Sequence, residues 1–309
     1  MIENLFIFAV SLFLVVKGAT LATKYAQKLA ENFQLSRYTI GFIIIAVISI
    51  LPETFISINS SLKGMPSFGL GTLLGSNVSD MTIVFAIIIL FAGRGMKIES
   101  RILKNNRIYP FLLLLPLILG LDGYYSRLEG AALVVDGAVF YYMAFENGAA
   151  GLKSAGEKNN RWKNLILLLL SMVILLAGAH FVVKSATTLA TIFGVNPVLI
   201  GMLVVGLGTT MPELFFALKS VKERDDSLAV GDILGTVLAD ATIVVGILGL
   251  IGPFSFPPKI IYITGTFMVL SSLMLFYFMR SGRVISKKET YMLFAFWVVF
   301  VLVEFMANK

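Results

Sequence analysis

The chain has 309 residues, of which 58% are apolar and only 14% are charged, and its mean hydropathy is +0.90. Soluble domains carry about 25% charged residues, so this composition excludes a soluble protein and predicts an integral membrane protein. The net charge of +7 does not indicate nucleic-acid binding, because the basic residues lie in short loops between apolar segments, and the lack of cysteine beside a single histidine excludes thiolate and multi-histidine metal sites.

Ten apolar segments follow one another and are predicted to cross the membrane as helices. The first five run over residues 5–30, 38–62, 68–91, 109–121 and 130–145. The second five run over residues 162–190, 198–218, 228–251, 260–279 and 291–305. The fourth and fifth segments are short, and residues 122–129 between them predict a tight hairpin. No cleavable signal sequence precedes the first segment, so the mature protein is expected to begin at residue 1.

Residues that are unusual in membrane helices recur at one constant offset. Glu213 follows Glu53 by 213 − 53 = 160 residues, and each glutamate is preceded by a proline. The same offset pairs Gly18 with Gly178, Lys24 with Lys184, Gly75 with Gly235, and Asp80 with Asp240. The sequence therefore predicts a duplication: a first five-helix repeat over residues 1–146 with its motif at about 38–91, a linker over 147–161, and a second repeat over 162–309 with its motif at about 198–251.

Five spans per repeat is an odd number, so the second repeat must enter the membrane from the opposite side. The fold class is accordingly predicted as an all-α membrane protein of ten helices in two inverted five-helix repeats, an architecture of many secondary transporters. Loop charges agree with it. Basic residues concentrate in the odd-numbered loops: Arg37; Arg94, Lys97, Arg101, Lys104 and Arg107; Lys153, Lys158, Arg161 and Lys163; Lys219, Lys222 and Arg224; Arg280, Arg283, Lys287 and Lys288. The positive-inside rule then places the odd loops in the cytoplasm and both termini outside the cell.

The second and seventh segments each carry a proline and a glutamate within an apolar run. Pro52 and Pro212 each remove an N–H and clash with the preceding turn, so both helices are predicted to break and to free backbone carbonyls. Broken helices at membrane depth are tolerated where they line a binding site. Glu53 and Glu213 are therefore predicted to face an ion.

The third and eighth segments add two aspartates. Ser76 and Asp80, like Thr236 and Asp240, lie four residues apart and hence on one helix face. Together with the glutamates they make four intramembrane carboxylates, surrounded by the hydroxyls of Ser49, Thr209, Thr210, Ser76 and Thr236. These hydroxyls have an alternative use, because serine and threonine often donate to their own helix. Asp232 has no acidic counterpart at Thr72, so both a structural and a site role stay open for it.

Carboxylate, hydroxyl and carbonyl oxygens suit hard cations such as Ca²⁺, which takes about six to eight of them. Four buried negative charges repel one another unless cations or protons bind. Competition between Ca²⁺ and Na⁺ or H⁺ at one site is the basis of antiport, and no organic cofactor is expected. The predicted partners are the lipid bilayer and inorganic cations; nucleic acid is not expected, and no obligatory protein partner is indicated.

These motifs resemble the Ca²⁺:cation antiporter superfamily, and most closely its prokaryotic-type Na⁺/Ca²⁺ exchangers. The family pattern G-T-S-x-P-E is similar to Gly208-Thr209-Thr210-Met211-Pro212-Glu213, and Gly75-Ser76-Asn77 with Asp80 fits the second element. The resemblance covers the whole chain. It implies inverted repeats around a central group of ion sites, with the first and sixth helices sliding against the others.

The resemblance also implies roles for single residues. Glu53 and Glu213 would be the central Ca²⁺ ligands. An outer Na⁺ site would use Thr209, Thr210, Ser76 and the carbonyl of Gly206. An inner Na⁺ site would use Glu53, Thr236, the carbonyl of Ala46 or a neighbour, and a hydroxyl that follows Ser49.

This chain departs from the pattern at the inner Na⁺ site, because the position of that hydroxyl is Ile50. Ile50 cannot bind an ion, whereas the aspartates at 80 and 240 raise the capacity to accept protons. Na⁺ is therefore the first expectation for the coupling ion and H⁺ the alternative.

A cation channel is disfavoured because duplicated broken helices suit an occluded midplane site. An intramembrane enzyme is disfavoured because no nucleophile–base set is present.

Overall fold

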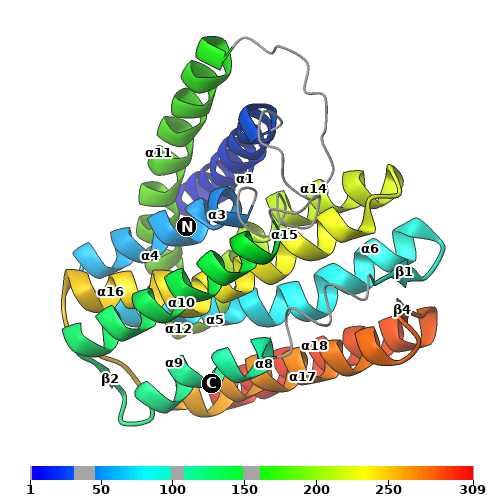
Figure 1. Ribbon diagram of the computed structural model, residues 1–309. Coiled ribbons are helices and arrows are strands. Elements are labelled where there is room, and N and C mark those ends of the chain that lie inside the picture. The colour runs from blue at the N-terminus through cyan, green and yellow to red at the C-terminus, as the bar shows by residue number, and fades with distance from the viewer. Residues whose placement is uncertain (1, 31–45, 99–107, 149–160, 309) are drawn as a thin grey trace.

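The computed structural model describes residues 2–30, 46–98, 108–148 and 161–308, and this part of the chain is almost entirely helical (Figure 1). The first half contains α1 (Ile2–Ala30), α3 (Ala46–Ser49), α4 (Leu51–Leu62), α5 (Pro66–Ser79), η2 (Asp80–Val84), α6 (Phe85–Ala92), α8 (Tyr109–Leu112), α9 (Leu114–Leu119) and α10 (Arg127–Gly148). The second half contains α11 (Arg161–Phe193), α12 (Pro197–Ile200), η3 (Gly201–Val205), α13 (Gly206–Thr209), α14 (Met211–Lys222), α15 (Asp226–Ala239), η4 (Asp240–Val244), α16 (Val245–Ile251), η5 (Ile260–Gly265), α17 (Thr266–Arg280) and α18 (Lys287–Ala307).

Seven helical runs within the described residues are long and apolar enough to cross a membrane. They are Glu3–Ala22, Pro66–Ala92, Trp162–Phe193, Pro197–Lys222, Asp226–Ile251, Ile260–Arg280 and Lys287–Ala307. The prediction of a mostly helical integral membrane protein is therefore confirmed. Three shorter or more polar helical stretches, 46–62, 109–119 and 127–148, lie where the remaining spans were predicted. Most of the predicted linker lies outside the described residues, as do six of the loop cations: Arg37, Arg101, Lys104, Arg107, Lys153 and Lys158.

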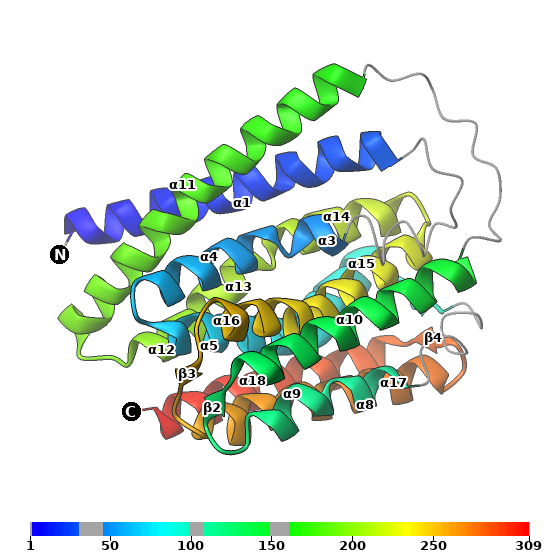
Figure 2. The same ribbon diagram turned by 60° about the vertical axis from the view of Figure 1, so that its left-hand side comes forward.

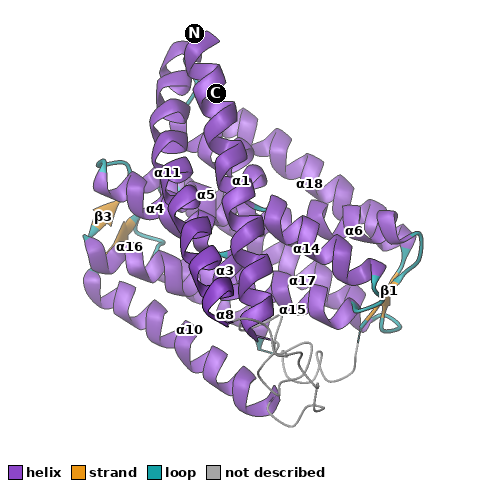
Figure 3. Ribbon diagram, turned by 90° about the horizontal axis from the view of Figure 1, so that it is seen from above, coloured by secondary structure: helices purple, strands orange, loops and turns teal. Residues whose placement is uncertain are grey.

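Two short strand pairs were not predicted from the sequence. β1 (Met96–Lys97) pairs antiparallel with β4 (Val284–Ile285), and β2 (Tyr124–Tyr125) pairs antiparallel with β3 (Phe254–Ser255). The two pairs lie at opposite ends of the helix bundle (Figure 3). Each joins loops from the two halves of the chain. A two-residue strand carries no periodicity of its own, so only the tertiary contact creates it.

Helices α1 and α11 lie side by side along one face of the molecule (Figure 2). Their backbones approach closely at two glycines. A Cβ atom on Gly18 would lie 2.9 Å from the backbone nitrogen of Leu175, and one on Gly178 would lie 2.9 Å from that of Val15. Small residues are what allow membrane helices to pack this tightly. The repeat offset of 160 residues relates Gly18 to Gly178 and Val15 to Leu175, so each of these contacts is the counterpart of the other.

The helix boundaries of the two halves recur at the same offset. The segments α3, α4, α5 and η2 begin and end 160 residues before α13, α14, α15 and η4. In both halves the long third-segment helix passes into a π-helical turn at an aspartate, Asp80 or Asp240. Such turns shift the side chains that follow them and are frequent at functional sites. The sequence analysis did not anticipate them, because no residue pattern marks a π-turn.

Candidate cation site

Both predicted helix breaks are present. Helix α3 ends at Ser49 and α4 begins at Leu51, while α13 ends at Thr209 and α14 begins at Met211; a proline is the second residue of α4 and of α14. Because proline has no N–H, the carbonyls of Ile48 and Gly208 lose their helical donors. A helix interruption therefore lies close in sequence to each of Glu53 and Glu213.

The carbonyls that the family resemblance implies as ligands keep hydrogen bonds. The Ala46 oxygen accepts the Ile50 amide at 3.0 Å, so it has a second lone pair left for a cation. The Gly206 oxygen accepts the Thr210 amide at 3.3 Å and the Thr209 hydroxyl at 2.9 Å. A cation at Gly206 would have to displace one of these two bonds.

The four predicted carboxylates, which we call the carboxylate cluster, are Glu53, Asp80, Glu213 and Asp240. Each is at most 1% exposed. All eight of their oxygens are buried and accept no hydrogen bond in the described part of the protein. Burying an ionised carboxylate without a partner is very costly, so this arrangement demands bound cations or protons. Glu304 shows the contrast, because this buried carboxylate accepts hydrogen bonds from Thr264 and Asn308.

Tertiary packing brings the carboxylate cluster together from both halves. Helix α3 packs on α15, α13 packs on α5, and α4 packs on η4. The Glu53 carboxyl acts electrostatically on Asp80, Glu213 and Asp240. Within the residues that the structure describes, no three Asp, Glu, His or Cys side chains surround one point as metal ligands. A cation bound there would complete its shell with hydroxyl and carbonyl oxygens, as Ca²⁺ sites commonly do.

Three of the five predicted hydroxyl ligands donate to their own helices. Ser76 donates to the carbonyl of Leu73, Thr209 to that of Gly206 and Thr210 to that of Leu207, each at 2.9 Å. The alternative of helix back-bonding is thus realised for them. A hydroxyl that donates its proton still presents oxygen lone pairs, so these bonds leave the oxygens available to a cation. The Thr209 hydroxyl lies beside the Glu53 carboxyl but donates to Gly206 instead.

The other two hydroxyls are those of Thr236 on α15 and of Ser49 on α3, which contacts α15. The Thr236 hydroxyl is fully buried and has no hydrogen-bond partner among the described residues. The Ser49 hydroxyl donates to Oδ1 of Asp232 at 3.1 Å. Asp232 is fully buried, and its Oδ2 atom accepts no hydrogen bond there. The sequence left the role of Asp232 open; the structure places it at the edge of the carboxylate cluster, where it acts electrostatically on Asp80 and Glu213.

Close backbone packing holds α5 against the broken helix of the other half. A Cβ atom on Gly75 would overlap with the carbonyl oxygen of Met202, and one on Gly206 would lie 3.1 Å from the amide nitrogen of Ser76. Asn77, on the same helix, donates from Nδ2 to the carbonyl of Val237 at 3.2 Å. Val237 is the residue that matches Asn77 in the second half, because the two lie 160 residues apart.

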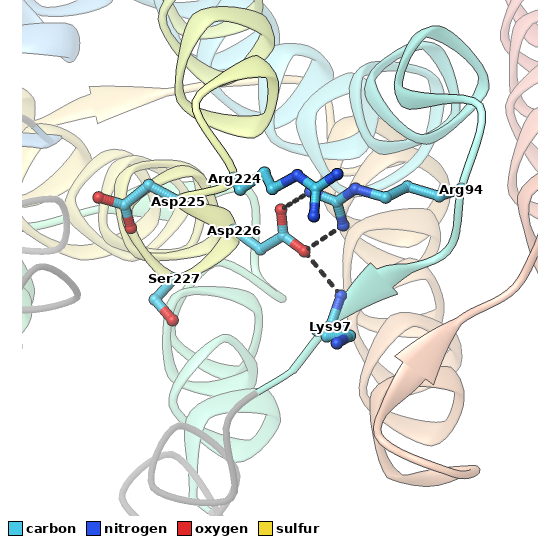
Figure 4. Close-up of a pocket in the computed structure, with 6 residues that line it drawn as sticks. All are labelled: Arg94, Lys97, Arg224, Asp225, Asp226 and Ser227. Atoms are coloured by element: carbon cyan, nitrogen blue, oxygen red, sulfur yellow. Dashed lines mark hydrogen bonds and ion pairs between the residues drawn. The ribbon is translucent and has the colours of Figure 1, made fainter.

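A pocket of about 420 Å³ lies away from the carboxylate cluster, where the loop after α6 meets the turn between α14 and α15. Figure 4 shows Asp226 held by Arg94. Both terminal nitrogens of Arg94 donate to the carboxylate at 2.7 Å, and the Lys97 amide donates at 2.9 Å. The hydrogen bonds from Arg94 to Asp226 raise the pKa of the Arg94 guanidinium. The pair joins two loops that the sequence analysis assigned to one side of the membrane.

Comparisons with known proteins match nearly the whole chain. The family model described as sodium/calcium exchanger protein matches residues 3–145 and 163–306. The chain is 27% identical to the putative antiporter CaxA of Alkalimonas amylolytica over 79% of each chain, and 24% identical to the sodium/calcium exchanger MaX1 of Methanosarcina acetivorans over 98% of each. A solved structure of the sodium-calcium exchanger NCX_Mj, soaked with Na⁺ and Sr²⁺, has the same fold: the TM-score is 0.74 at 21% identity, over 97% of this chain and 98% of that one.

Proposed function

Because the chain belongs to the sodium/calcium exchanger protein family, we propose that it exchanges Ca²⁺ for Na⁺ by alternating access at the carboxylate cluster. Membership makes the protein a membrane antiporter of inorganic cations rather than an enzyme. The observation that carries the proposed site is the set of eight buried carboxylate oxygens without a hydrogen-bond partner among the described residues. The attraction of bound cations offsets the desolvation cost of these groups and screens their mutual repulsion.

In this proposal Ca²⁺ binds between Glu53 and Glu213, the two glutamates at the helix breaks. Asp80 and Asp240 complete the charge of the cluster. The oxygens of Ser49, Ser76, Thr209, Thr210 and Thr236 and the carbonyls of Ala46 and Gly206 serve the transported cations. Na⁺ and Ca²⁺ would compete for overlapping oxygens, so binding of one favours release of the other.

The inverted-repeat architecture of ten spans, with repeats over residues 1–146 and 162–309 and a linker over 147–161, is part of the proposal. The exchanged contacts of Gly18 and Gly178 support it, because a two-fold axis makes such contacts mutual. The hydrogen bond from Asn77 to Val237 supports it further. A residue that contacts its own counterpart in the other repeat lies next to the two-fold axis that relates the repeats.

The proposed orientation has odd-numbered loops in the cytoplasm and both termini outside. It is supported by contacts between loops of the same parity. Strands β1 and β4 follow the third and ninth spans, and β2 and β3 follow the fourth and eighth. Both chain ends lie at the end of the bundle that carries β2 and β3 (Figure 2). Basic loops at the opposite end agree with the positive-inside rule.

Single cysteines test this orientation, since the natural chain has none. Lys63 and Glu223 are exposed, and they occupy the same position in the two repeats. In intact cells we expect a membrane-impermeant maleimide to label Lys63→Cys and to label Glu223→Cys only after permeabilisation. Labelling of both variants from the same side would contradict inverted repeats, and the reverse pattern would overturn the orientation alone.

The coupling ion is tested by uptake of radiolabelled Ca²⁺ into proteoliposomes that contain the purified protein. We expect an outward Na⁺ gradient to drive uptake and an outward H⁺ gradient to drive little. Uptake driven only by H⁺ would replace Na⁺ by H⁺ as the coupling ion, which the isoleucine at position 50 and the number of carboxylates favour as the second candidate. Ca²⁺ flux that needs no counter-ion would indicate a channel.

A further inference from the structure

One helix face carries three polar residues toward the carboxylate cluster at a spacing of four. Asp232, Thr236 and Asp240 follow one another along α15 and into η4, and all three are fully buried. Residues at this spacing lie on one side of a helix. The matching face of α5 carries Thr72 and Ser76 before Asp80. Asp232 is therefore a charge that the second half has and the first half lacks.

Asp232 is only half satisfied as a structural residue. Its Oδ1 atom accepts the Ser49 hydroxyl at 3.1 Å, while its Oδ2 atom is buried without a hydrogen-bond donor in the described part of the chain. Thr236, one turn further along, also has an unpartnered oxygen. Thr72, the counterpart of Asp232, has instead a hydroxyl that donates to the carbonyl of Phe68 at 2.9 Å. A buried carboxylate oxygen with no partner is expensive unless something positive occupies the space beside it.

The position between α3 and α4 lacks a side-chain oxygen. Ile50 directly follows Ser49, is 7% exposed, and its apolar side chain belongs to the main hydrophobic cluster of the protein. At position 50 the broken helix thus lacks the hydroxyl oxygen of the family pattern. The helix that packs against it, α15, has at Asp232 a carboxylate that the matching helix α5 lacks.

We propose that Asp232 is a cation ligand that works with Ser49 and supplies the oxygen that Ile50 cannot provide. The proposal rests on the proposed antiport function and identifies a residue that sets cation affinity at the same site. A carboxylate is a stronger ligand for a hard cation than the hydroxyl it replaces, and affinity rises with the charge of the ligands. Asp232 would therefore strengthen cation binding on the Ser49 side of the cluster.

Asp232→Asn separates this role from a structural one. Asparagine has nearly the same shape and keeps an oxygen that accepts the Ser49 hydroxyl, but it removes the charge. We expect the half-saturating concentration of Na⁺ or Ca²⁺ for exchange in proteoliposomes to rise at least about tenfold, as expected when a site loses a charged ligand. Thermal stability in detergent without added cations should not fall, since the hydrogen bond is kept and a buried charge is removed.

Two further variants sharpen the result. Thr72→Ser changes the matching position in the first repeat without adding volume and keeps a hydroxyl, and it is expected to alter the half-saturating concentrations less than about threefold, because no charge is lost. Ile50→Ser, added to Asp232→Asn, is expected to restore a large part of the lost affinity by placing an oxygen at the break between α3 and α4, which a double-mutant cycle would measure.

The outcomes distinguish the two proposals. If the wild-type protein shows no gradient-driven Ca²⁺ uptake, the proposed function fails. If the wild type exchanges Ca²⁺ and Asp232→Asn keeps wild-type half-saturating concentrations for both ions, the role of Asp232 as a ligand is wrong. If Asp232→Asn loses affinity and the added Ile50→Ser does not restore it, Asp232 remains a ligand. The idea that Asp232 replaces an oxygen missing at position 50 would then be wrong.

Discussion

Glu213→Gln is expected to abolish Na⁺-driven Ca²⁺ uptake, lowering its rate by about two orders of magnitude or more, because Ca²⁺ affinity depends on the number of charged ligands. Glu213 is fully buried, and neither of its carboxylate oxygens has a hydrogen-bond partner among the described residues. Its charge has no structural partner that would explain its presence, so we expect the substitution to weaken cation binding. The rate is measured in proteoliposomes with matched amounts of wild-type and variant protein.

The same substitution should leave the fold intact. Glutamine has the size of glutamate, and removing an unpartnered buried charge relieves repulsion from Glu53 and Asp80. We expect a thermal midpoint in detergent no lower than that of the wild type. Glu223→Gln is the matched control, because Glu223 is an exposed glutamate just beyond the same helix. Exchange at wild-type rates in Glu213→Gln would remove this glutamate from the site.

Gly75→Ala is expected to lower the thermal midpoint in detergent and to reduce exchange at least about tenfold, because overpacking a tight contact typically costs about 1–3 kcal/mol. A Cβ atom at this position would overlap with the carbonyl oxygen of Met202, which is backbone and cannot rotate away. Either α5 or the segment around Met202 must move. Because Ser76 and Asp80 follow on α5, that movement would also displace groups of the cation site.

Gly252→Ala is the matched control for this second variant. Nothing lies within 4 Å of a Cβ atom on Gly252, and its φ of −166° is extended backbone that alanine adopts freely. Its thermal midpoint and its exchange rate should equal those of the wild type. If Gly75→Ala melts and exchanges like Gly252→Ala, the contact between α5 and Met202 does not position the site.

The sequence by itself determined the class of the protein and predicted most of the residues of the candidate site. Apolar segments of membrane-spanning length cannot be mistaken for a soluble core, and their number and spacing predicted helices where the described chain has them. Glu53 and Glu213, and likewise Asp80 and Asp240, were found because each pair repeats at one offset. Charge inside a membrane is rare enough that such repetition points to a site.

Only the tertiary structure decided how these groups are satisfied. The sequence could not tell whether Ser76 and Thr209 donate to their own helices, nor that Asp232 accepts from Ser49, 183 residues away. Nor did any pattern mark the π-turns or the two strand pairs. The physical reason is the same in each case. Hydrogen-bond partners and backbone contacts such as Gly75 with Met202 join segments that are distant in sequence, and they exist only once the helices of the two halves have packed together.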